Sequence, residues 1–333
     1  MEYVNLGNTG IRVSRVILGC GNFGGVGSAP EFYGQGESEE EAFELMDRAL
    51  DLGINVFDTA DAYGGGRSEA MIGRWLEARG SSVRDQVLVS TKVFNPVAEG
   101  PNDWGLSRRH IRRQVEASLD RLGGEAIDMY LIHEADPSTP LEETLGVLDD
   151  LVHAGKVHYV GASNVTASLI SQSLELSKEL HLERFRWIQN QYSLLERADE
   201  ADVFPLCEKE GLGYTPFSPL AGGFLTGKYR LDEEYPEGSR MATRPEPYLD
   251  HWNEKTFERL GRLSELAADK AVSSAGLALA WVMARPQITA PIVGPRRLGH
   301  FDAIEEALSL DLSSEETQEI SELFGGEGDV ERS

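Results

Sequence analysis

Short apolar runs alternate with longer amphipathic segments along most of the chain. Eight runs, each bounded by glycine or polar residues, have the length and composition of buried β-strands. They are residues 16–19, 54–57, 86–91, 127–132, 157–161, 187–190, 212–216 and 288–293. Other segments have apolar positions three or four residues apart, which predicts helices. The predicted helices are residues 39–50, 68–78, 109–122, 140–153, 167–180, 201–210, 255–270, 274–285, 301–308 and 315–323.

This alternation predicts a parallel sheet, because consecutive parallel strands need a crossover connection such as a helix. Eight such units in 333 residues favour an α/β fold of the (β/α)8 TIM-barrel type, formed by residues 1–333 as a single domain. Segments 3–6 and 11–14, joined by a Gly/Asn turn, predict an N-terminal β-hairpin. An open doubly wound sheet is the alternative. It requires a glycine-rich turn that opens a helix directly after the first strand, whereas here the glycines after residue 18 open a long loop.

Two helix starts carry specific sequence signals. Ser38 and Glu41 have capping-box spacing. Thr139, Pro140 and Glu142 combine an N-cap, a proline at the first helical position and an acid in the first turn. Segment 219–250 shows no such periodicity, so we expect it to be irregular.

Reactive side chains follow three consecutive predicted strands. Asp58 ends one strand and Tyr63 lies in the loop after it, Lys92 follows the next strand, and His133 follows the third. The carboxyl ends of all strands of a barrel lie on one rim, where active sites form. Each residue alone has an ordinary structural role: the acid as a helix cap, the phenol in packing, the lysine in a rim ion pair, the imidazole in the core. Their placement on consecutive units favours a catalytic site.

These four side chains suit the protonation of a carbonyl oxygen. We expect Asp58 and Lys92 to form a partly buried ion pair. The Lys92 ammonium should lower the pKa of the Tyr63 phenol from about 10, so that the phenol can protonate a developing alkoxide. His133 can donate a second hydrogen bond to the same oxygen. No metal site or nucleophile–base pair is apparent in the sequence, so a nicotinamide hydride donor is the economical source of electrons.

The composition limits the partners of this chain. Its formal net charge is −25, which disfavours nucleic acid and anionic membrane surfaces. No apolar run approaches the ~18–20 residues of a membrane span, and the N-terminus lacks the pattern of a secretory signal. The two cysteines, Cys20 and Cys207, give no disulfide framework and no metal-ligand spacing, which fits a reducing, cytoplasmic setting.

The basic residues are unevenly divided, since seven of the 31 are lysine and the rest arginine. Abundant acid with little lysine suggests a protein that works at high salt, where counter-ions screen its self-repulsion. An acidic cytoplasmic enzyme from an arginine-rich proteome explains the same composition equally well.

Six motifs, in this order and spacing, resemble those of the aldo-keto reductases, and the resemblance extends from about Tyr3 to Leu323. The motifs are FDTADAYG at 57–64, STK at 90–92, YLIH at 130–133, GASN at 161–164, QNQY at 189–192 and FSPLAGG at 217–223. The most similar branch contains bacterial, archaeal and potassium-channel-β-like members.

The resemblance implies the roles of individual residues. Asp58, Tyr63, Lys92 and His133 would form the catalytic tetrad, with Tyr63 as the general acid. Phe217 would stack on the nicotinamide ring. The remaining cofactor-binding positions would be Gly21, Asn22 and Phe23 in the first loop, Asp58, then Ser163, Asn164 and Gln191 at the nicotinamide carboxamide, Ser218, Pro219, Leu220, Gly222, Lys228 and Arg240 at the pyrophosphate, and Gly294, Arg296 and His300 at the adenosine end.

The implied cofactor is NADPH (NADP+), with NADH a poorer fit, because an arginine such as Arg296 suits the 2′-phosphate. Ala303 and Ile304 stand where the family often has Glu-Asn beside the adenine, so the adenine contacts should differ. The implied activity is reduction of a small aldehyde or ketone to an alcohol by a monomer or small homo-oligomer, with no metal. A nucleotide-sensing accessory subunit, like the potassium-channel β subunits, is one alternative, and a non-redox barrel enzyme is another.

Overall fold

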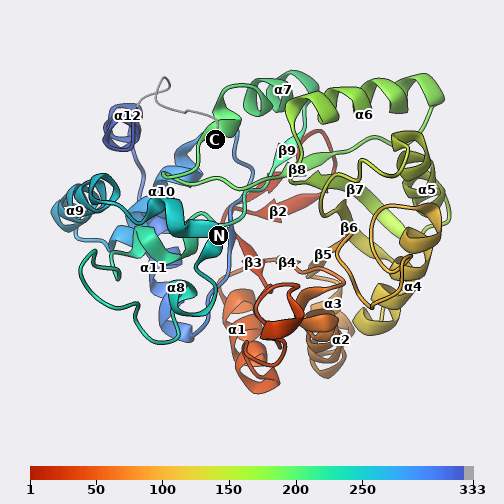
Figure 1. The fold of residues 1–333 in the computed structure, drawn as a ribbon, viewed down its shortest axis with the longest axis horizontal. Coiled ribbons are helices and arrows are strands. Elements are labelled where there is room, and N and C mark those ends of the chain that lie inside the picture. Colours follow the sequence, from red (N-terminus) through yellow and green to blue (C-terminus); the bar gives the residue numbers. More distant parts are fainter. Residues whose placement is uncertain (326–333) are drawn as a thin grey trace.

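The computed structural model describes residues 1–325 and contains an eight-stranded parallel sheet with helices around it (Figure 1). The end of the predicted single domain, residues 326–333, lies outside the described residues. The strands are β1 (Tyr3–Asn5), β2 (Arg12–Ser14), β3 (Ile17–Gly19), β4 (Val56–Asp58), β5 (Leu88–Val93), β6 (Ile127–Ile132), β7 (Val157–Ser163), β8 (Trp187–Gln189), β9 (Gly213–Tyr214) and β10 (Ile292–Val293). All eight predicted barrel strands are present.

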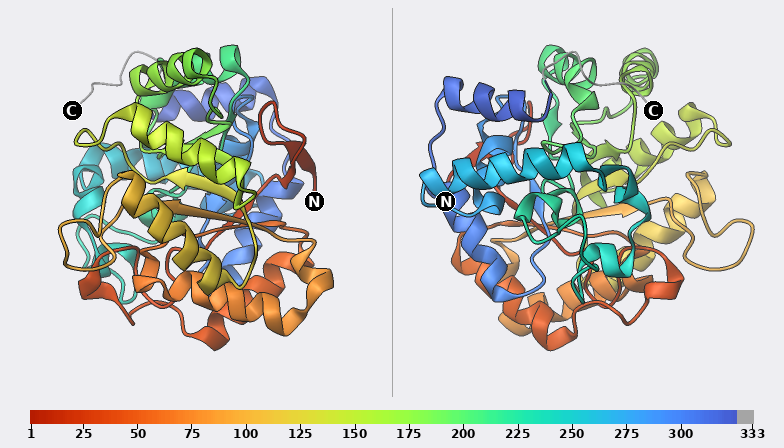
Figure 2. Two further views of the ribbon diagram at one scale, coloured as in Figure 1. Left: turned by 90° about the vertical axis from the view of Figure 1, so that its right-hand side faces the viewer. Right: turned by 60° about the vertical axis from the view of Figure 1, so that its left-hand side comes forward.

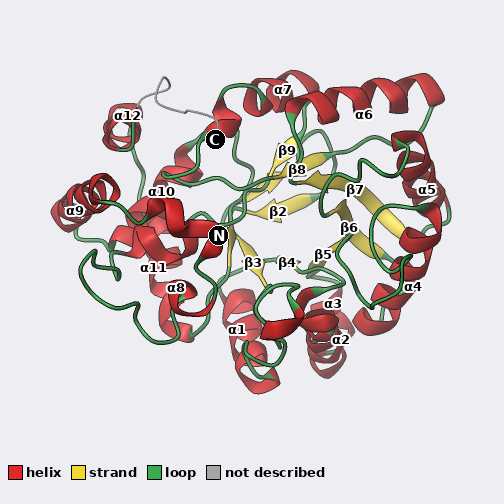
Figure 3. Cartoon of the chain, viewed as in Figure 1, coloured by secondary structure: helices red, strands yellow, loops and turns green. Residues whose placement is uncertain are grey.

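Backbone hydrogen bonds close this sheet on itself. The strand order is β10-β3-β4-β5-β6-β7-β8-β9, and β10 pairs in parallel with β3. At the other edge, the amides of Thr289 and Ile292 donate to the carbonyl oxygens of Tyr214 and Pro216, both at 2.8 Å. Figure 3 shows the strands in the centre and the helices outside them. The predicted (β/α)8 barrel is confirmed, and the doubly wound alternative is wrong because the edges of an open sheet would not meet.

The predicted N-terminal hairpin is also present and covers the amino ends of the barrel strands. β1 and β2 pair antiparallel, and the hairpin lies at one end of the barrel (Figure 2). In the turn, Gly7 has a φ of +52° and a Cβ there would lie 2.4 Å from the Gly213 nitrogen, so only glycine fits. Leu6 and Val13 are fully buried among the side chains that fill the barrel interior.

The alternation of side chains along the strands decides which residues reach the interior. In β4, Val56 belongs to the interior cluster and Phe57 to the core between sheet and helices, so Asp58 points inward. The register pairs Asp58 with Ser90 and Lys92 with Leu131. Inward positions near the amino ends of the strands are therefore apolar, whereas those at the carboxyl ends are polar and meet at one rim.

Helices surround the barrel on all sides. They are α1 (Glu39–Asp51), α2 (Arg67–Arg79), α3 (Ser81–Arg84), α4 (Arg108–Leu122), α5 (Leu141–His153), α6 (Ala167–Leu180), α7 (Val203–Glu210), α8 (Arg240–Thr243), α9 (Glu254–Asp269), α10 (Ser274–Ala284), α11 (Phe301–Ser309) and α12 (Ser314–Leu323). Each predicted helix is present, α6 with the predicted bounds. No helix within residues 1–325 is long and apolar enough to span a membrane by itself, although α9 and α10, which meet at 90°, pass that test together by length and composition.

The predicted helix starts were right in one case and displaced in the other. The Ser38 side chain accepts from the Glu41 amide while the Glu41 carboxylate accepts from the Ser38 amide, so the capping box of α1 is confirmed. At α5, Pro140 rather than Thr139 is the N-cap, and the helix begins one residue later than predicted. The Thr139 hydroxyl instead donates to the Asp136 carboxylate at 2.7 Å, which holds this side chain against the preceding loop.

The segment 219–250 is less irregular than predicted. It contains 3-10 helices at Ala221–Thr226 and Glu246–His251, together with α8. The Ser239 side chain caps α8 by accepting from the Ala242 amide. Because each of these elements is only four or six residues long, much shorter than the window over which a helical period can be recognised, they leave no periodic signal in the sequence.

Candidate active site

The structure brings Asp58, Tyr63, Lys92 and His133 together at the carboxyl rim of the barrel. Asp58 is the last residue of β4, and Tyr63 begins a 3-10 helix in the loop that follows. Lys92 lies near the end of β5, and His133 directly follows β6. Three neighbouring strands therefore deliver all four side chains, as the sequence predicted.

Asp58 and Lys92 form the expected ion pair, and it is more deeply buried than expected. Lys92 is 1% exposed and Asp58 is 4% exposed. The Lys92 Nζ lies 2.5 Å from Asp58 Oδ1 and also donates to the Thr59 carbonyl at 2.7 Å. The other carboxylate oxygen, Oδ2, accepts from Ser90 Oγ at 2.8 Å and Gln189 Nε2 at 2.9 Å. A buried pair is stable only with such additional hydrogen bonds, and these bonds fix the position of the ammonium group.

The direction predicted for the pKa of Tyr63 is wrong. The Lys92 ammonium lies 5.0 Å from the centre of the Tyr63 ring and does lower the pKa of the phenol. Burial acts in the opposite sense and is the larger effect, so the pKa of Tyr63 is raised from 10. For Lys92, burial lowers the pKa, but the charges of Asp58 and Tyr63 outweigh it and raise the pKa. At neutral pH the site therefore holds a phenol with its proton beside a charged ammonium.

His133 is neutral at the same pH. Burial, helped by the Lys92 charge, lowers the pKa of His133 well below 6.5. The imidazole stands edge-on to the Tyr63 ring, with ring centres 5.5 Å apart, and its Nε2 lies 3.3 Å from the Tyr63 hydroxyl oxygen. Its Nδ1 lies 2.9 Å from the Nδ2 atom of Asn95. Sequence reasoning missed Asn95, although a polar residue three positions after Lys92 is a detectable signal of a residue at the rim.

The residues predicted at the nicotinamide carboxamide lie beside the tetrad. Asn164 Nδ2 donates to the His133 carbonyl at 2.9 Å and to Ser163 Oγ at 3.3 Å. Gln191 forms a parallel bridge with Phe217 on the neighbouring strand end. Asn164 and Ser218 have φ values of +53° and +55°, which non-glycine residues rarely adopt. Such backbone strain gathers at ligand sites, so it supports a binding role for this part of the rim.

The first loop covers the other side of Tyr63. A Cβ on Gly21 would lie 3.5 Å from the Tyr63 ring, so the backbone of this glycine lies over the phenol. Asn22 accepts the Glu37 amide through its carbonyl, and the Phe23 side chain is 1% exposed. These contacts hold the loop against the rim, and Gly21 helps to bury the phenol.

The predicted pyrophosphate segment folds tightly next to Phe217, which packs against the barrel interior. Pro219 is buried and Leu220 packs against the core. Gly222 has a φ of +62°, and a Cβ there would lie 2.6 Å from the Tyr248 ring. The Tyr248 hydroxyl is 3.0 Å from Ser218 Oγ. Tyr248, which the sequence analysis did not identify, therefore packs against Gly222 and Ser218 and covers this segment.

Cationic side chains gather where the cofactor phosphates are predicted. Burial and the charges of neighbouring arginines lower the pKa of Lys228, and burial lowers the pKa of Arg240, whose Nε is buried with no hydrogen-bond partner. Burial together with Arg297, Lys228 and Arg296 lowers the pKa of His300 to about 4. Within residues 1–325, Glu37 is the one carboxylate that forms an ion pair with this cluster. A positive cluster in a chain of net charge −25 suits an anion, and the unpaired Arg240 donor fits a phosphate oxygen.

Arg296 holds the adenosine end of this cluster together. Its Nε donates to Glu37 Oε1 at 2.7 Å and its Nη1 donates to the Gly238 carbonyl at 2.9 Å. Its backbone amide donates to His300 Nδ1 at 3.1 Å. Gly294, at the end of β10, would place a Cβ 3.4 Å from the Gly19 carbonyl, so this segment lies against the first strand. The residues present thus fit a nicotinamide dinucleotide with phosphates at Lys228, Arg240 and Arg296.

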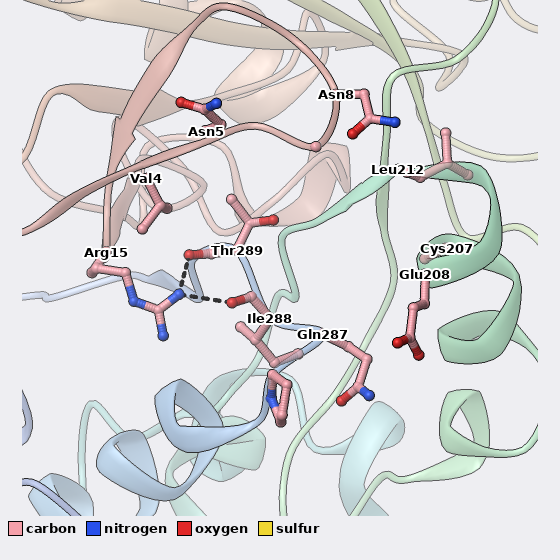
Figure 4. Close-up of a pocket in the computed structure, with 13 residues that line it drawn as sticks. Val4, Asn5, Asn8, Arg15, Cys207, Glu208, Leu212, Gln287, Ile288 and Thr289 are labelled. Atoms are coloured by element: carbon pink, nitrogen blue, oxygen red, sulfur yellow. Dashed lines mark hydrogen bonds between the residues drawn. The ribbon is translucent and has the colours of Figure 1, made fainter.

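A separate cavity of about 390 Å³ lies at the opposite, amino end of the strands (Figure 4). The hairpin, the end of α7 and the residues before β10 line it. Its one arginine, Arg15, donates to the carbonyl oxygens of Ile288 and Thr289 at 2.7 Å and 2.5 Å. These contacts satisfy carbonyl groups of the fold, as expected for the stabilising end of a barrel.

Comparison with known proteins agrees with this geometry. The model of the Aldo/keto reductase family matches residues 15–324. An uncharacterized oxidoreductase of Bacillus subtilis, YrpG, is 39% identical over 98% of this chain and 97% of its own length. The versiconal hemiacetal acetate reductase of Aspergillus parasiticus is 33% identical over 97% of both chains.

A third relative is named a probable voltage-gated potassium channel subunit beta, from Oryza sativa subsp. japonica, and is 33% identical over 96% of this chain and 94% of its own length. The family model covers every segment that builds the rim. The resemblance inferred from the motifs is therefore confirmed, and the protein is an NAD(P)H-dependent oxidoreductase of the aldo/keto reductase family.

Proposed function

We propose that this protein reduces an aldehyde or ketone to an alcohol with NADPH as the preferred cofactor and Tyr63 as the general acid. One observation carries the proposal: a protonated phenol stands between a buried ammonium, Lys92, and a neutral imidazole, His133. This is the combination needed to protonate an oxygen that gains negative charge. When bound, the reduced nicotinamide supplies the hydride that the carbonyl carbon accepts.

Each member of the tetrad has a separate task in this proposal. Tyr63 gives its hydroxyl proton to the carbonyl oxygen. The Lys92 ammonium, held by Asp58, stabilises the phenolate that remains. His133 Nε2 donates a hydrogen bond to the carbonyl oxygen and keeps it in place. Raising the pKa of the phenol weakens it as an acid, but it also ensures that the proton is present across the neutral range.

The preference for NADPH over NADH rests on the cationic cluster. Lys228 and Arg240 would hold the pyrophosphate, and Arg296 with His300 would meet the 2′-phosphate. Ser163, Asn164 and Gln191 would hold the carboxamide, and Phe217 would stack on the ring. Arg296 already donates through Nε to Glu37 and through Nη1 to the Gly238 carbonyl, so the 2′-phosphate would bind at Nη2.

The substrate is a small carbonyl compound, and its identity depends on the loops over the rim. Trp104 is 45% exposed and stands edge-on to Phe94, with ring centres 6.0 Å apart. An exposed indole in this loop supports an aromatic or apolar substrate. The Aspergillus parasiticus relative is named a reductase, which supports reduction of the carbonyl compound rather than oxidation of the alcohol.

The proposal is tested by NADPH oxidation with a panel of aldehydes and ketones, using native protein and Tyr63→Phe. Removing the general acid should lower kcat by about 10²–10⁴-fold. NADPH binding, followed by its fluorescence, should stay close to native because the ring of residue 63 is retained. Native turnover that survives the substitution would refute the role of Tyr63.

A second candidate is an accessory subunit that senses the nucleotide, and the rice relative named as a potassium channel subunit beta favours it. Such a protein would bind NADPH tightly but turn over slowly with every carbonyl compound in the panel. Turnover within the usual enzymatic range of about 1–10³ per second would exclude this candidate.

A further inference from the structure

Asn95 is the one side chain in contact with the far nitrogen of His133, as the hydrogen bonds within residues 1–325 show. The Asn95 Nδ2 lies 2.9 Å from His133 Nδ1. The Asn95 amide is oriented with its nitrogen towards the ring. An amide nitrogen donates and does not accept, so in this orientation His133 Nδ1 is the acceptor. Among the groups that face the imidazole, Tyr63 carries its proton and is uncharged, whereas the Lys92 charge, added to the larger effect of burial, lowers the pKa of His133 and disfavours an imidazolium.

The contact decides where the proton of His133 lies. A neutral imidazole has one N–H and one lone pair, and Asn95 uses the lone pair on Nδ1. The proton must then be on Nε2, which points at the Tyr63 hydroxyl oxygen from 3.3 Å. In the other tautomer, Nε2 would accept the Tyr63 proton and hold it away from a substrate.

The direction of this hydrogen bond sets the direction of the next one. Before a substrate binds, Nε2 donates to the Tyr63 oxygen, so one lone pair of that oxygen is occupied and its own proton is free to point elsewhere. A carbonyl oxygen that enters beside Tyr63 can then receive that proton, and the Nε2–H group turns to the same carbonyl oxygen, as in the proposed function. Asn95 therefore acts on the reacting proton indirectly. Its amide donates to His133, and His133 donates to the Tyr63 oxygen, so Asn95 does not contact the substrate oxygen itself.

The backbone around Asn95 is fixed on both sides. Pro96 follows it and restricts its backbone to extended conformations. The carbonyl of Phe94, the preceding residue, accepts from the Gly105 amide at 2.8 Å, which closes the base of the loop. The His133 amide donates to the Val93 carbonyl at 2.9 Å. Donor and acceptor are therefore held at neighbouring strand ends, β5 and β6.

We propose that Asn95 is a positioning residue that fixes neutral His133 in the Nε2–H tautomer, so that the Tyr63 proton is directed to the substrate. The inference rests on the proposed function, in which Tyr63 protonates the carbonyl. It makes a claim about the resting protein as well, because the tautomer exists whether or not a carbonyl compound is reduced.

The tautomer is measured directly by long-range ¹H–¹⁵N NMR of the native protein labelled with ¹⁵N-histidine, with His133→Gln to assign the signal. We expect His133 to show a protonated Nε2 and an unprotonated Nδ1 across pH 6–8. A protonated Nδ1 in the native protein overturns the inference, even if the enzyme reduces carbonyl compounds as proposed. The expected tautomer in a protein that reduces nothing would instead refute the proposed function alone.

Substitution at Asn95 adds a kinetic test. Asn95→Asp replaces the donor by an acceptor, which holds a proton on Nδ1 and raises the pKa of the imidazole. At low pH the imidazolium of this variant carries a proton on both nitrogens, so Nε2 can still donate and the variant should be active. As pH rises from 6 to 8 the Nε2 proton is lost, and kcat should fall about tenfold or more. Asn95→Leu should show a mixture of tautomers and a loss of kcat that does not depend on pH.

The matched control is Asn102→Asp, the same change on the same loop at an exposed position. It should keep the native tautomer, the native pH profile and native NADPH binding. A pH profile of Asn95→Asp that parallels this control would overturn the inference. If Asn95→Asp fails to fold, the tautomer ratio of Asn95→Leu decides, since a merely structural role would leave the ratio unchanged.

Discussion

At the scale of single residues, burial and the nearest charge decide the proton state of the site. Lys92 and His133 are both buried, yet their proton states differ. Lys92 is charged because the Asp58 carboxylate accepts a hydrogen bond from its ammonium group, whereas His133 is neutral because burial and the Lys92 charge both lower the pKa of its imidazole. The sequence could predict that these side chains meet, because each follows a strand end. It could not predict that the pKa of Tyr63 rises, because the burial depends on Gly21, which a separate loop lays over the phenol.

Arg296 tests the cofactor preference at this scale. Arg296→Leu should weaken NADPH binding by about tenfold or more, because a charge-assisted hydrogen bond to the 2′-phosphate is lost. The dissociation constant for NADH should change little, since NADH has no 2′-phosphate. Arg109→Leu, an exposed arginine on α4, is the control for the lost charge. Equal weakening of both cofactors would contradict the assignment of Arg296 to the 2′-phosphate.

Asp61 is a buried acid that the proposed mechanism does not use. It is 1% exposed, and neither carboxylate oxygen has a hydrogen-bond partner among the described residues. Burial, and then the charge of Glu69, raise the pKa of Asp61 well above 3.8. Glu69 in turn pairs with Arg121 at 2.6 Å, and no cation within residues 1–325 forms an ion pair with Asp61.

The free energy of unfolding should therefore depend on pH through Asp61. Because the folded pKa is raised, the native state binds the proton more tightly, and stability falls as pH rises above the unfolded value of about 4. The free energy of unfolding of Asp61→Asn should therefore exceed that of the native protein. The difference should grow above pH 4 by up to about 1.4 kcal/mol per pH unit, and it should stop growing at the pH where Asp61 ionises in the folded protein. Urea unfolding at pH 4, 6 and 8 measures this, with exposed Asp120→Asn as control. A difference that is constant with pH would show that Asp61 is not the cause.

At the scale of elements, periodicity and capping residues predicted a helix or strand correctly wherever the residues that determine it all lie within that segment. α6 has its cap, Thr166, and its apolar stripe within fifteen residues, and it was predicted with the observed bounds. α5 begins one residue later than predicted, and the Thr139 hydroxyl donates to Asp136 in the preceding loop. Contacts made by another segment are invisible to periodicity. The same reason explains why Asn95 and Tyr248 escaped the sequence analysis, since each acts through a residue from a distant strand or loop.

Close packing between α2 and α4 depends on one glycine. A Cβ on Gly73 in α2 would lie 2.1 Å from the Arg121 carbonyl oxygen, whereas one on Gly261 in α9 would have no atom within 4 Å. Gly73→Ala should destabilise the protein by about 1–3 kcal/mol, because the two helices must separate. Gly261→Ala should stabilise it by about 0.5–1 kcal/mol through helix propensity alone. Thermal unfolding of the two variants measures the difference, and equal effects would show that α2 and α4 adapt freely.

At the scale of the whole molecule, charge is divided between a strongly acidic exterior and a compact basic site. Several exposed arginines form ion pairs on the exterior, as Arg74 does with Glu39 and Arg79 with Asp47. The cations at Lys228, Arg240 and Arg296 instead gather around the predicted phosphates, and among the described residues only Arg296 forms an ion pair, with Glu37. This division would attract an anionic dinucleotide to one place on a molecule that otherwise repels anions. The excess of acid can be read from the composition, but only the fold places the basic residues of distant segments side by side.

The excess of acid predicts that salt stabilises the protein. Molar salt shortens the Debye length to about 3 Å and so screens repulsion between exposed carboxylates. If several like-charge contacts of ~0.5 kcal/mol each are relieved, the gain is about 2 kcal/mol, which raises the Tm by about 3 °C for a chain of this length. Thermal unfolding from 0.05 to 2 M KCl measures the effect, and sucrose at matched osmolality serves as the uncharged control. Screening also weakens the surface ion pairs, so an ordinary acidic enzyme should show a flat or falling Tm. That result would favour the arginine-rich proteome as the origin of this composition, whereas a rise well above the sucrose control would favour adaptation to high salt.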